Sequence, residues 1–345
     1  MQNVNGVNPN LRTPYTQQWN FTIERQIYSL GLRASYAGSR SVALVYRRNL
    51  NLPLPGVIPF TTGRRPNQRF NQVIFADSGG TDTYHALELG AQKKYGQNLT
   101  FSTGFTWAKD LTDTQDSGGG GTTFGGQVIQ NPANRAIEKA NNGLVVARRI
   151  FAYATYQLPF GNGQPMLGGA PAVVQYIAGG WRTTWTAVAQ SGQYFTPSFS
   201  SFDPSGTGTN GGIPDRVGNG NLSSGRSVSR FFDPSAFVVP GCPRTAPLCT
   251  QTTPIGRFGN SGFNILEGPR IRNLDIGILK DFRFQERLTL RFMVTMVNAL
   301  NHPNFSVPAS NISAPTAVGV ISGQTRPLLG EPGPREIDFS LRISF

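Results

Sequence analysis

The chain has 345 residues, including 41 glycines and 25 prolines, and only 14% of the residues are charged. Turn formers are abundant and long stretches with a 3.6-residue period are missing, which argues against an α-rich fold. No run of about 18 apolar residues occurs, so a transmembrane helix is excluded. The net charge of +13 favours anionic partners, but the basic residues are scattered, and we do not expect nucleic acid among them.

The start of the chain, residues 1–10, is polar and lacks the basic-then-apolar pattern of a secretory signal peptide. The strand pattern along the rest of the chain nevertheless predicts an outer-membrane protein, which must be exported from the cytoplasm. We therefore expect Met1 to lie within a longer gene product.

Stretches of about ten residues in which apolar and polar side chains alternate are the clearest local signal. In the first, Trp19, Phe21 and Ile23 alternate with polar residues. One apolar and one polar face fit a strand between lipid and a wet interior. In chain order, strands are predicted at residues 18–27, 32–36, 87–94, 99–107, 148–158, 181–194, 273–280, 288–296 and 336–345.

The connections between these strands alternate in length. Short or medium connections are expected at 29–31, 95–98, 160–180 and 282–287, and long ones at 38–83, 109–146, 196–269 and 301–335. In an up-and-down antiparallel barrel, this order places all long loops on one side. Short periplasmic turns and long extracellular loops are typical of outer-membrane barrels. A soluble β-sandwich also predicts alternating polarity, but not alternating loop lengths.

The end of the chain sets the expected orientation. If Phe345 lies at the periplasmic rim, counting back places the N-terminus outside. Trp19 and Trp107 then fall near outer strand ends, and Tyr28, Trp181 and Phe345 near inner ends. These residues would form the two aromatic girdles of a transmembrane barrel.

The strand count indicates a piece of a larger barrel. Nine strands are predicted, whereas bacterial single-chain barrels have even numbers, so either one strand is unrecognised or the chain is a piece of a larger barrel. An open sheet would also leave two unpaired edges in lipid. The predicted fold is therefore an all-β, antiparallel, up-and-down transmembrane β-barrel segment with long extracellular loops.

A series of motifs along the chain resembles a known family. The segments 257–269, 273–282, 297–305 and 335–345 look like the C-terminus of TonB-dependent receptors of the Oar-like type, which carry a carboxypeptidase-regulatory-like N-terminal domain. Each motif is weak alone, but their order is specific. Upstream segments that are similar to strands of the same family lie at 15–25, 84–89, 103–109, 156–161, 179–181 and 190–196.

The resemblance implies a non-enzymatic role in substrate uptake across the bacterial outer membrane. Residues 1–345 would supply the C-terminal part of the barrel, about nine of roughly 22 strands, without the plug domain and signal peptide. TonB would be contacted only through that absent N-terminal part. The substrate, a small molecule or peptide, is not identified.

The final strand also resembles the signal that the barrel assembly machinery reads. Its alternating apolar residues end in an aromatic one, and they are Ile337, Phe339, Leu341, Ile343 and Phe345. Outer-membrane lipid and the assembly machinery are thus the other expected partners.

No catalytic, cofactor-binding or metal-binding residue is predicted. The only histidines, His85 and His302, have no nucleophile or acid placed beside them by sequence. The segment 206–211 fits G-x-G-x-x-G but lacks the flanking strand and helix of a dinucleotide site. Asp110, Asp113 and Asp116 are close enough for a calcium site, but their spacing fits no known loop, which favours solvated carboxylates.

The two cysteines, Cys242 and Cys249, lie in a stretch rich in turn formers. Their spacing suits a small disulfide-closed loop in an oxidising compartment, and two unpaired loop thiols are the alternative. Two other functions stay open at this point. One is a self-sufficient small porin or adhesin, which requires closure, and the other is a secreted β-sandwich binding module.

Overall fold

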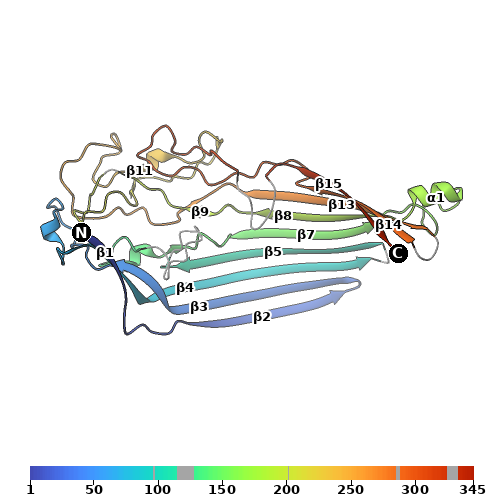
Figure 1. Cartoon of the computed structure of the whole chain (residues 1–345), viewed down its shortest axis with the longest axis horizontal. Helices are drawn as coiled ribbons and strands as arrows, with labels where there is room; N and C mark the ends of the chain where they lie inside the picture. Colours follow the sequence, from blue (N-terminus) through green and yellow to red (C-terminus); the bar gives the residue numbers. More distant parts are fainter. Residues whose placement is uncertain (96–97, 115–127, 201, 285–287, 325–332) are drawn as a thin grey trace.

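The computed structural model describes residues 1–95, 98–114, 128–200, 202–284, 288–324 and 333–345. Among them, nine long strands form one antiparallel sheet in which the strands follow one another in chain order (Figure 1). They are β2 (Tyr15–Ile27), β3 (Leu30–Asn49), β4 (Phe70–Tyr95), β5 (Leu99–Thr112), β7 (Arg148–Gln157), β8 (Trp181–Gln190), β13 (Ile271–Phe284), β14 (Leu288–Val297) and β15 (Glu336–Ser344). Each overlaps one predicted strand, and the all-β antiparallel fold is confirmed.

The two ends of the sheet differ as the loop lengths indicated. The C-terminus and the short connections lie at one end, the turn end, and the N-terminus and the long connections lie at the other, the loop end (Figure 1). The medium connection at the turn end contains a short helix, α1 (Ala172–Ala178), which the sequence analysis did not predict. No helix among the described residues is long and apolar enough to cross a membrane.

The connection predicted at 38–83 is wrong in extent. β3 continues to Asn49 and β4 begins at Phe70, so the two strands stay paired well beyond the predicted hairpin. The N-terminal segment, for which no strand was predicted, forms β1 (Gln2–Val7), which pairs in parallel with β4. Ile74 and Ala76 are buried in this extension. Its alternation is interrupted by Gly79 and Gly80, which hid the strand from sequence analysis.

The sixth predicted strand is also shorter than expected. β8 ends at Gln190 rather than residue 194, and Gly192 lies between β8 and the next short strand. A Cβ atom at Gly192 would collide with the backbone carbonyl of Gly268, so only glycine allows this close approach. The chain then forms β9 (Tyr194–Phe195), which pairs with β12 (Leu266–Glu267).

Cross-strand register gives the sheet one apolar and one polar face. One row of directly paired residues runs through Phe21, Tyr36, Leu87 and Trp107, and all four are exposed. Gly38 lies opposite Trp19, and it leaves room for the indole ring to lie across the neighbouring strand. A large area of exposed apolar side chains on one face is the surface expected for contact with lipid.

The loop end has a small hydrophobic core of its own. The connections 191–270 and 298–335 supply most of it, with Phe232 stacked edge-on against both Phe195 and Phe237. The core is framed by two-residue strands β10 (Asp215–Arg216) and β11 (Phe237–Val238). Other short elements are β6 (Ala140–Asn141) and the 3₁₀ turns at Thr62–Arg64, Arg135–Glu138 and Pro234–Ala236. These contacts order the long loops above the sheet.

The sheet is open. β2 and β15 are its edges, and every residue of both strands is exposed. In β15, the exposed residues include both the apolar series ending at Ile343 and the polar ones between them. Within the described residues, no further strand pairs with either edge.

The two faces predict opposite responses to charge. Ala187 lies on the apolar face of β8 and its neighbour Thr186 on the polar face. We expect Ala187→Arg to lower the free energy of unfolding in phospholipid vesicles by about 2–4 kcal/mol, because it places a guanidinium in hydrocarbon. The matched control, Thr186→Arg, should change it by no more than about 0.5 kcal/mol. Urea titration measures both, and equal effects would contradict the assignment of the faces.

Candidate functional site

The predicted aromatic girdle residues lie near the strand ends. Trp107 is 60% exposed on the apolar face of β5, toward the loop end, and Trp19 lies toward the loop end of β2. Tyr28 and Phe345 are fully exposed at the turn end. Trp181 begins β8 at the same end and donates its indole N–H to the carbonyl of Ile177 in α1. All five therefore lie where a membrane interface would meet the sheet, and their role as a girdle stays a prediction.

A buried lysine connects the turn end to α1. Lys280 occupies an apolar-face position of β13 but is only 4% exposed. Its ammonium group donates to the carbonyl of Gly179, just after the helix, and lies 4.9 Å from the centre of the Phe282 ring and 5.8 Å from that of Trp181. Carbonyl and aromatic contacts thus offset the removal of this charge from water.

The polar face carries ion pairs between neighbouring strands. Arg291 donates to both carboxylate oxygens of Asp281 across the β13–β14 pair, at 2.6 and 3.0 Å. Arg33 and Glu24 lie 3.8 Å apart across β2 and β3. On the next strand, Arg342 lies opposite Arg291 in the register. Such a charged, hydrated surface is typical of a barrel interior.

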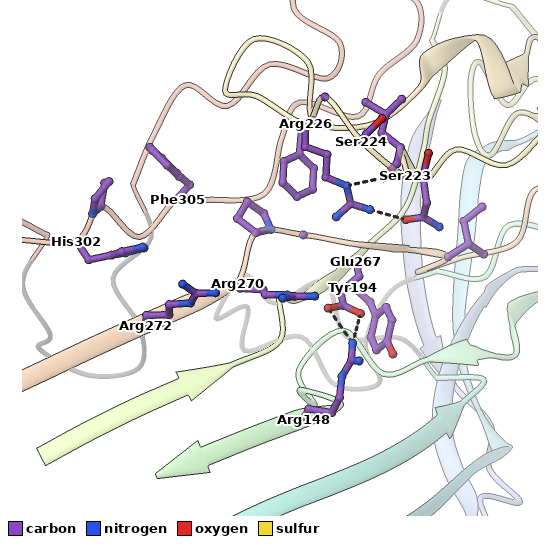
Figure 2. Close-up of a pocket in the computed structure, with 18 residues that line it drawn as sticks. Arg148, Tyr194, Ser223, Ser224, Arg226, Glu267, Arg270, Arg272, His302 and Phe305 are labelled. Atoms are coloured by element: carbon purple, nitrogen blue, oxygen red, sulfur yellow. Dashed lines mark hydrogen bonds and ion pairs between the residues drawn. The ribbon is translucent and has the colours of Figure 1, made fainter. Parts of the chain in front are cut away.

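A large cavity opens at the loop end and is lined by arginines from three separate parts of the chain (Figure 2). It has a volume of about 1070 Å³. Arg148 begins β7, Arg226 lies in the long connection before β13, and Arg270 and Arg272 lie at the start of β13. Tyr194, Ser223 and Ser224 add hydroxyl groups to the lining.

One carboxylate, Glu267, faces these arginines. It accepts two hydrogen bonds from Arg148, at 3.0 and 3.3 Å (Figure 2). Arg226 is held from the other side, with its guanidinium 5.1 Å from the centre of the Phe231 ring and its Nε donating to the carbonyl of Leu222. The cavity therefore has an excess of positive charge and suits an anionic ligand.

Sequence analysis missed this cluster. Its members come from a stretch of more than a hundred residues, and no local pattern marks them as one group. The weak signal was the net charge of +13, which indicated anionic partners without locating them. The cluster exists only because the loop between β8 and β13 folds back over the strand ends.

The histidines are not arranged for catalysis among the described residues. His85 Nδ1 and the Tyr36 hydroxyl share a hydrogen bond of 2.7 Å on the apolar face, and the ring lies 6.2 Å from that of Trp19. His302 lines the arginine cavity, and its Nδ1 is buried without a hydrogen-bond partner in the described part of the chain.

The aspartates considered for calcium are dispersed. Asp113 pairs with Arg135 at 2.6 Å, and Asp116 lies outside the described residues. Asp110 instead interacts with Asp82 on the neighbouring strand, beyond Trp107 and outside the band expected to cross the membrane. Burial and the Asp82 carboxylate raise the pKa of Asp110 to about 7. Over the described ranges, no three potential ligands come together as a metal site.

The cysteines and the glycine-rich motif both belong to the loop layer. Cys242 and Cys249 form a disulfide with their Cα atoms 5.6 Å apart, and Cys242 is part of the loop core. The segment 206–211 is a loop, with Gly206 and Gly208 at positive φ and no helix after it. It therefore has neither the strand nor the helix that a dinucleotide site needs.

The sequence matches a family of known domains. Residues 1–337 match the family described as outer membrane beta barrel domain. A comparison with curated proteins gave no match.

The fold is similar to parts of solved transporters. The outer membrane transporter YddB from Escherichia coli aligns over 97% of this chain and 33% of its own, with 9% identity and a TM-score of 0.47. The FrpB iron transporter from Neisseria meningitidis aligns over 99% and 32%, with 11% identity and a TM-score of 0.41. The copper transporter OprC aligns over 98% and 32%, with 7% identity and a TM-score of 0.39. The chain spans about a third of each of these structures.

The acidic pair predicts a pH dependence of stability. The pKa of folded Asp110, about 7, lies above that of an unfolded aspartate, ~3.9. The folded chain thus binds more protons between about pH 4 and 7, so its stability should fall as pH rises through this window and level off above it. We expect Asp110→Asn to remove this decline and to be more stable than wild type at pH 8.

Urea unfolding at several pH values measures the effect of Asp110→Asn. As a control, Asp113→Asn breaks the ion pair with Arg135 and should lower stability at pH 8. An unchanged pH profile in Asp110→Asn would show that this carboxyl group does not titrate as inferred.

Proposed function

Because the chain belongs to the family of outer membrane beta barrel domains, we propose that it forms part of the wall of a TonB-dependent receptor of the Oar-like type, which takes up a substrate across the bacterial outer membrane. The observation that carries this proposal is the sheet itself, with one apolar face, one polar face and all long connections at one end. The loop end faces the cell exterior and the turn end faces the periplasm.

The open edges support a larger barrel. A strand edge cannot remain unpaired in lipid, because its N–H and C=O groups would lack partners. β2 and β15 each need a further strand, so residues 1–345 contribute the C-terminal part of the barrel. The plug domain and the TonB-contact segment belong to a preceding part of the protein. A self-sufficient small porin or adhesin is a weaker candidate, because it requires β2 to pair with β15.

The side chains support transport rather than catalysis. His85 is engaged with Tyr36 on the apolar face, and the polar face carries paired charges rather than a nucleophile with its base. The loops with their own core and disulfide form an ordered outer surface for substrate recognition. A secreted sandwich module would not expose an apolar face of this extent.

Genetics tests the transport proposal. We expect deletion of this gene and deletion of TonB in the source bacterium to impair growth on the same limiting nutrient, without a further loss in the double mutant. Growth of each strain over a panel of single nutrient sources measures this. The contrary outcome is a double mutant that grows worse on this nutrient than the TonB mutant does, by as much as the gene deletion alone impairs growth. That result would refute energy coupling and favour a porin.

The last strand predicts an assembly phenotype. We propose that Ile337, Phe339, Leu341, Ile343 and Phe345 form the signal for the barrel assembly machinery. Phe345→Ala should lower the amount of folded protein in the outer membrane several-fold, because it removes the terminal aromatic group. Ser344→Ala, on the polar face, is the matched control. Quantitative blotting of membrane fractions measures both, and normal assembly of Phe345→Ala would contradict the proposal.

A further inference from the structure

The arginine cavity lies on the membrane-facing side of the sheet. Arg148 is directly opposite Trp107, which is on the apolar face. Arg272 is opposite Ala189, which in turn is opposite Ile150, also on that face. Arg270 immediately precedes β13 and lines the same cavity as Arg272, and buried Ile271 lies between them.

The arginines lie at the height of lipid headgroups. Trp107 marks the loop-end limit of the apolar face on β5, and Arg148 extends the same cross-strand row. On β13, the apolar face begins at Leu274, which is two residues from Arg272 in the direction of the turn end. A guanidinium directly above apolar side chains at a membrane interface meets the polar headgroups of the nearest leaflet.

The charge on the cavity is only partly neutralised. Glu267 neutralises Arg148, whereas Arg270 and Arg272 form no ion pair with any described residue. Both side chains are exposed. The guanidinium groups of Arg270 and Arg272 therefore have N–H donors available for a ligand. Each guanidinium is planar and presents its donors in a geometry that matches the oxygens of a phosphate group.

The size and the lining of the cavity also suit a ligand larger than a single ion. Its volume of about 1070 Å³ exceeds what a single phosphate fills. Arg226 is fixed over Phe231, so its orientation is set before a ligand arrives. Ser223 and Ser224 offer hydroxyl groups on the same wall. A polar headgroup with both phosphate and hydroxyl substituents would satisfy these donors together.

We propose that Arg148, Arg226, Arg270 and Arg272 form a site for the phosphate groups of a glycolipid headgroup in the outer leaflet of the membrane. The site anchors the loop end at the membrane surface and is separate from substrate passage along the polar face. The inference rests on the proposed orientation, in which the loop end faces the exterior.

The test measures lipid binding to the full-length protein purified from outer membranes in detergent. Diphosphoryl lipid A is the probe, titrated by native mass spectrometry. The Arg270→Gln/Arg272→Gln double variant should bind it roughly tenfold or more weakly, because each charged hydrogen bond that is lost costs affinity. Arg149→Gln is the matched control, because Arg149 is exposed on the opposite face of β7, and it should bind as wild type does.

Two further probes decide the chemistry and the source of the ligand. The first probe is lipid A with both phosphates removed, titrated against the wild-type protein. Its affinity should be no higher than the affinity of the double variant for diphosphoryl lipid A. Unchanged affinity of the double variant, or equal binding of the dephosphorylated lipid, overturns the proposal. Displacement of lipid A by millimolar inorganic phosphate alone would assign the site to a soluble anion and overturn the lipid source.

A labelling experiment separates this proposal from the proposed orientation. Ser224→Cys places a thiol at the cavity, and the native cysteines are in a disulfide. A membrane-impermeant maleimide should label this variant in intact cells. Absence of labelling in intact cells, with labelling after permeabilisation, would refute the orientation, whereas the lipid titration tests the arginine site independently.

Discussion

The pairing of backbone groups between neighbouring strands is the constraint on which the structure depends. A chain that crosses hydrocarbon has no water to satisfy its N–H and C=O groups, so each crossing strand must be bonded on both sides. The continuous order from β2 to β15 meets this requirement for the inner strands. The two edges do not meet it, and this is the physical reason for placing the chain within a larger barrel.

The same constraint determines where irregular structure is allowed. The turn end keeps its connections short or folds them onto the sheet, as α1 does over Lys280. At the loop end, water satisfies the backbone, so the chain is free to form long connections with a separate hydrophobic core. Phe232 and its aromatic neighbours, the disulfide and the Arg257–Asp215 pair, at 2.6 Å, order this layer without help from lipid.

The boundary between the apolar face and the loop layer is where charge and lipid meet. On β5 the apolar face ends at Trp107. Arg148 of β7 lies directly opposite Trp107, and Arg272 lies near the start of β13. On the polar face, by contrast, Arg291 is matched with Asp281 across the strands. Arg270 and Arg272 thus lie without an ion pair on the side where anionic headgroups are available, which links the electrostatics of the rim to the position of the chain in the membrane.

The sequence by itself determined the strands, their faces and the alternation of loop lengths, because period-two polarity and turn composition are local signals that survive in any context. It also placed Trp181 and Phe345 near the turn end. Only the tertiary structure decided the extension of β3 and β4, the parallel pairing of β1, the Asp82–Asp110 contact and the arginine cavity. Each of these depends on segments distant in the chain that meet through the register of the sheet or the folding of a long loop, and no local pattern encodes such a meeting.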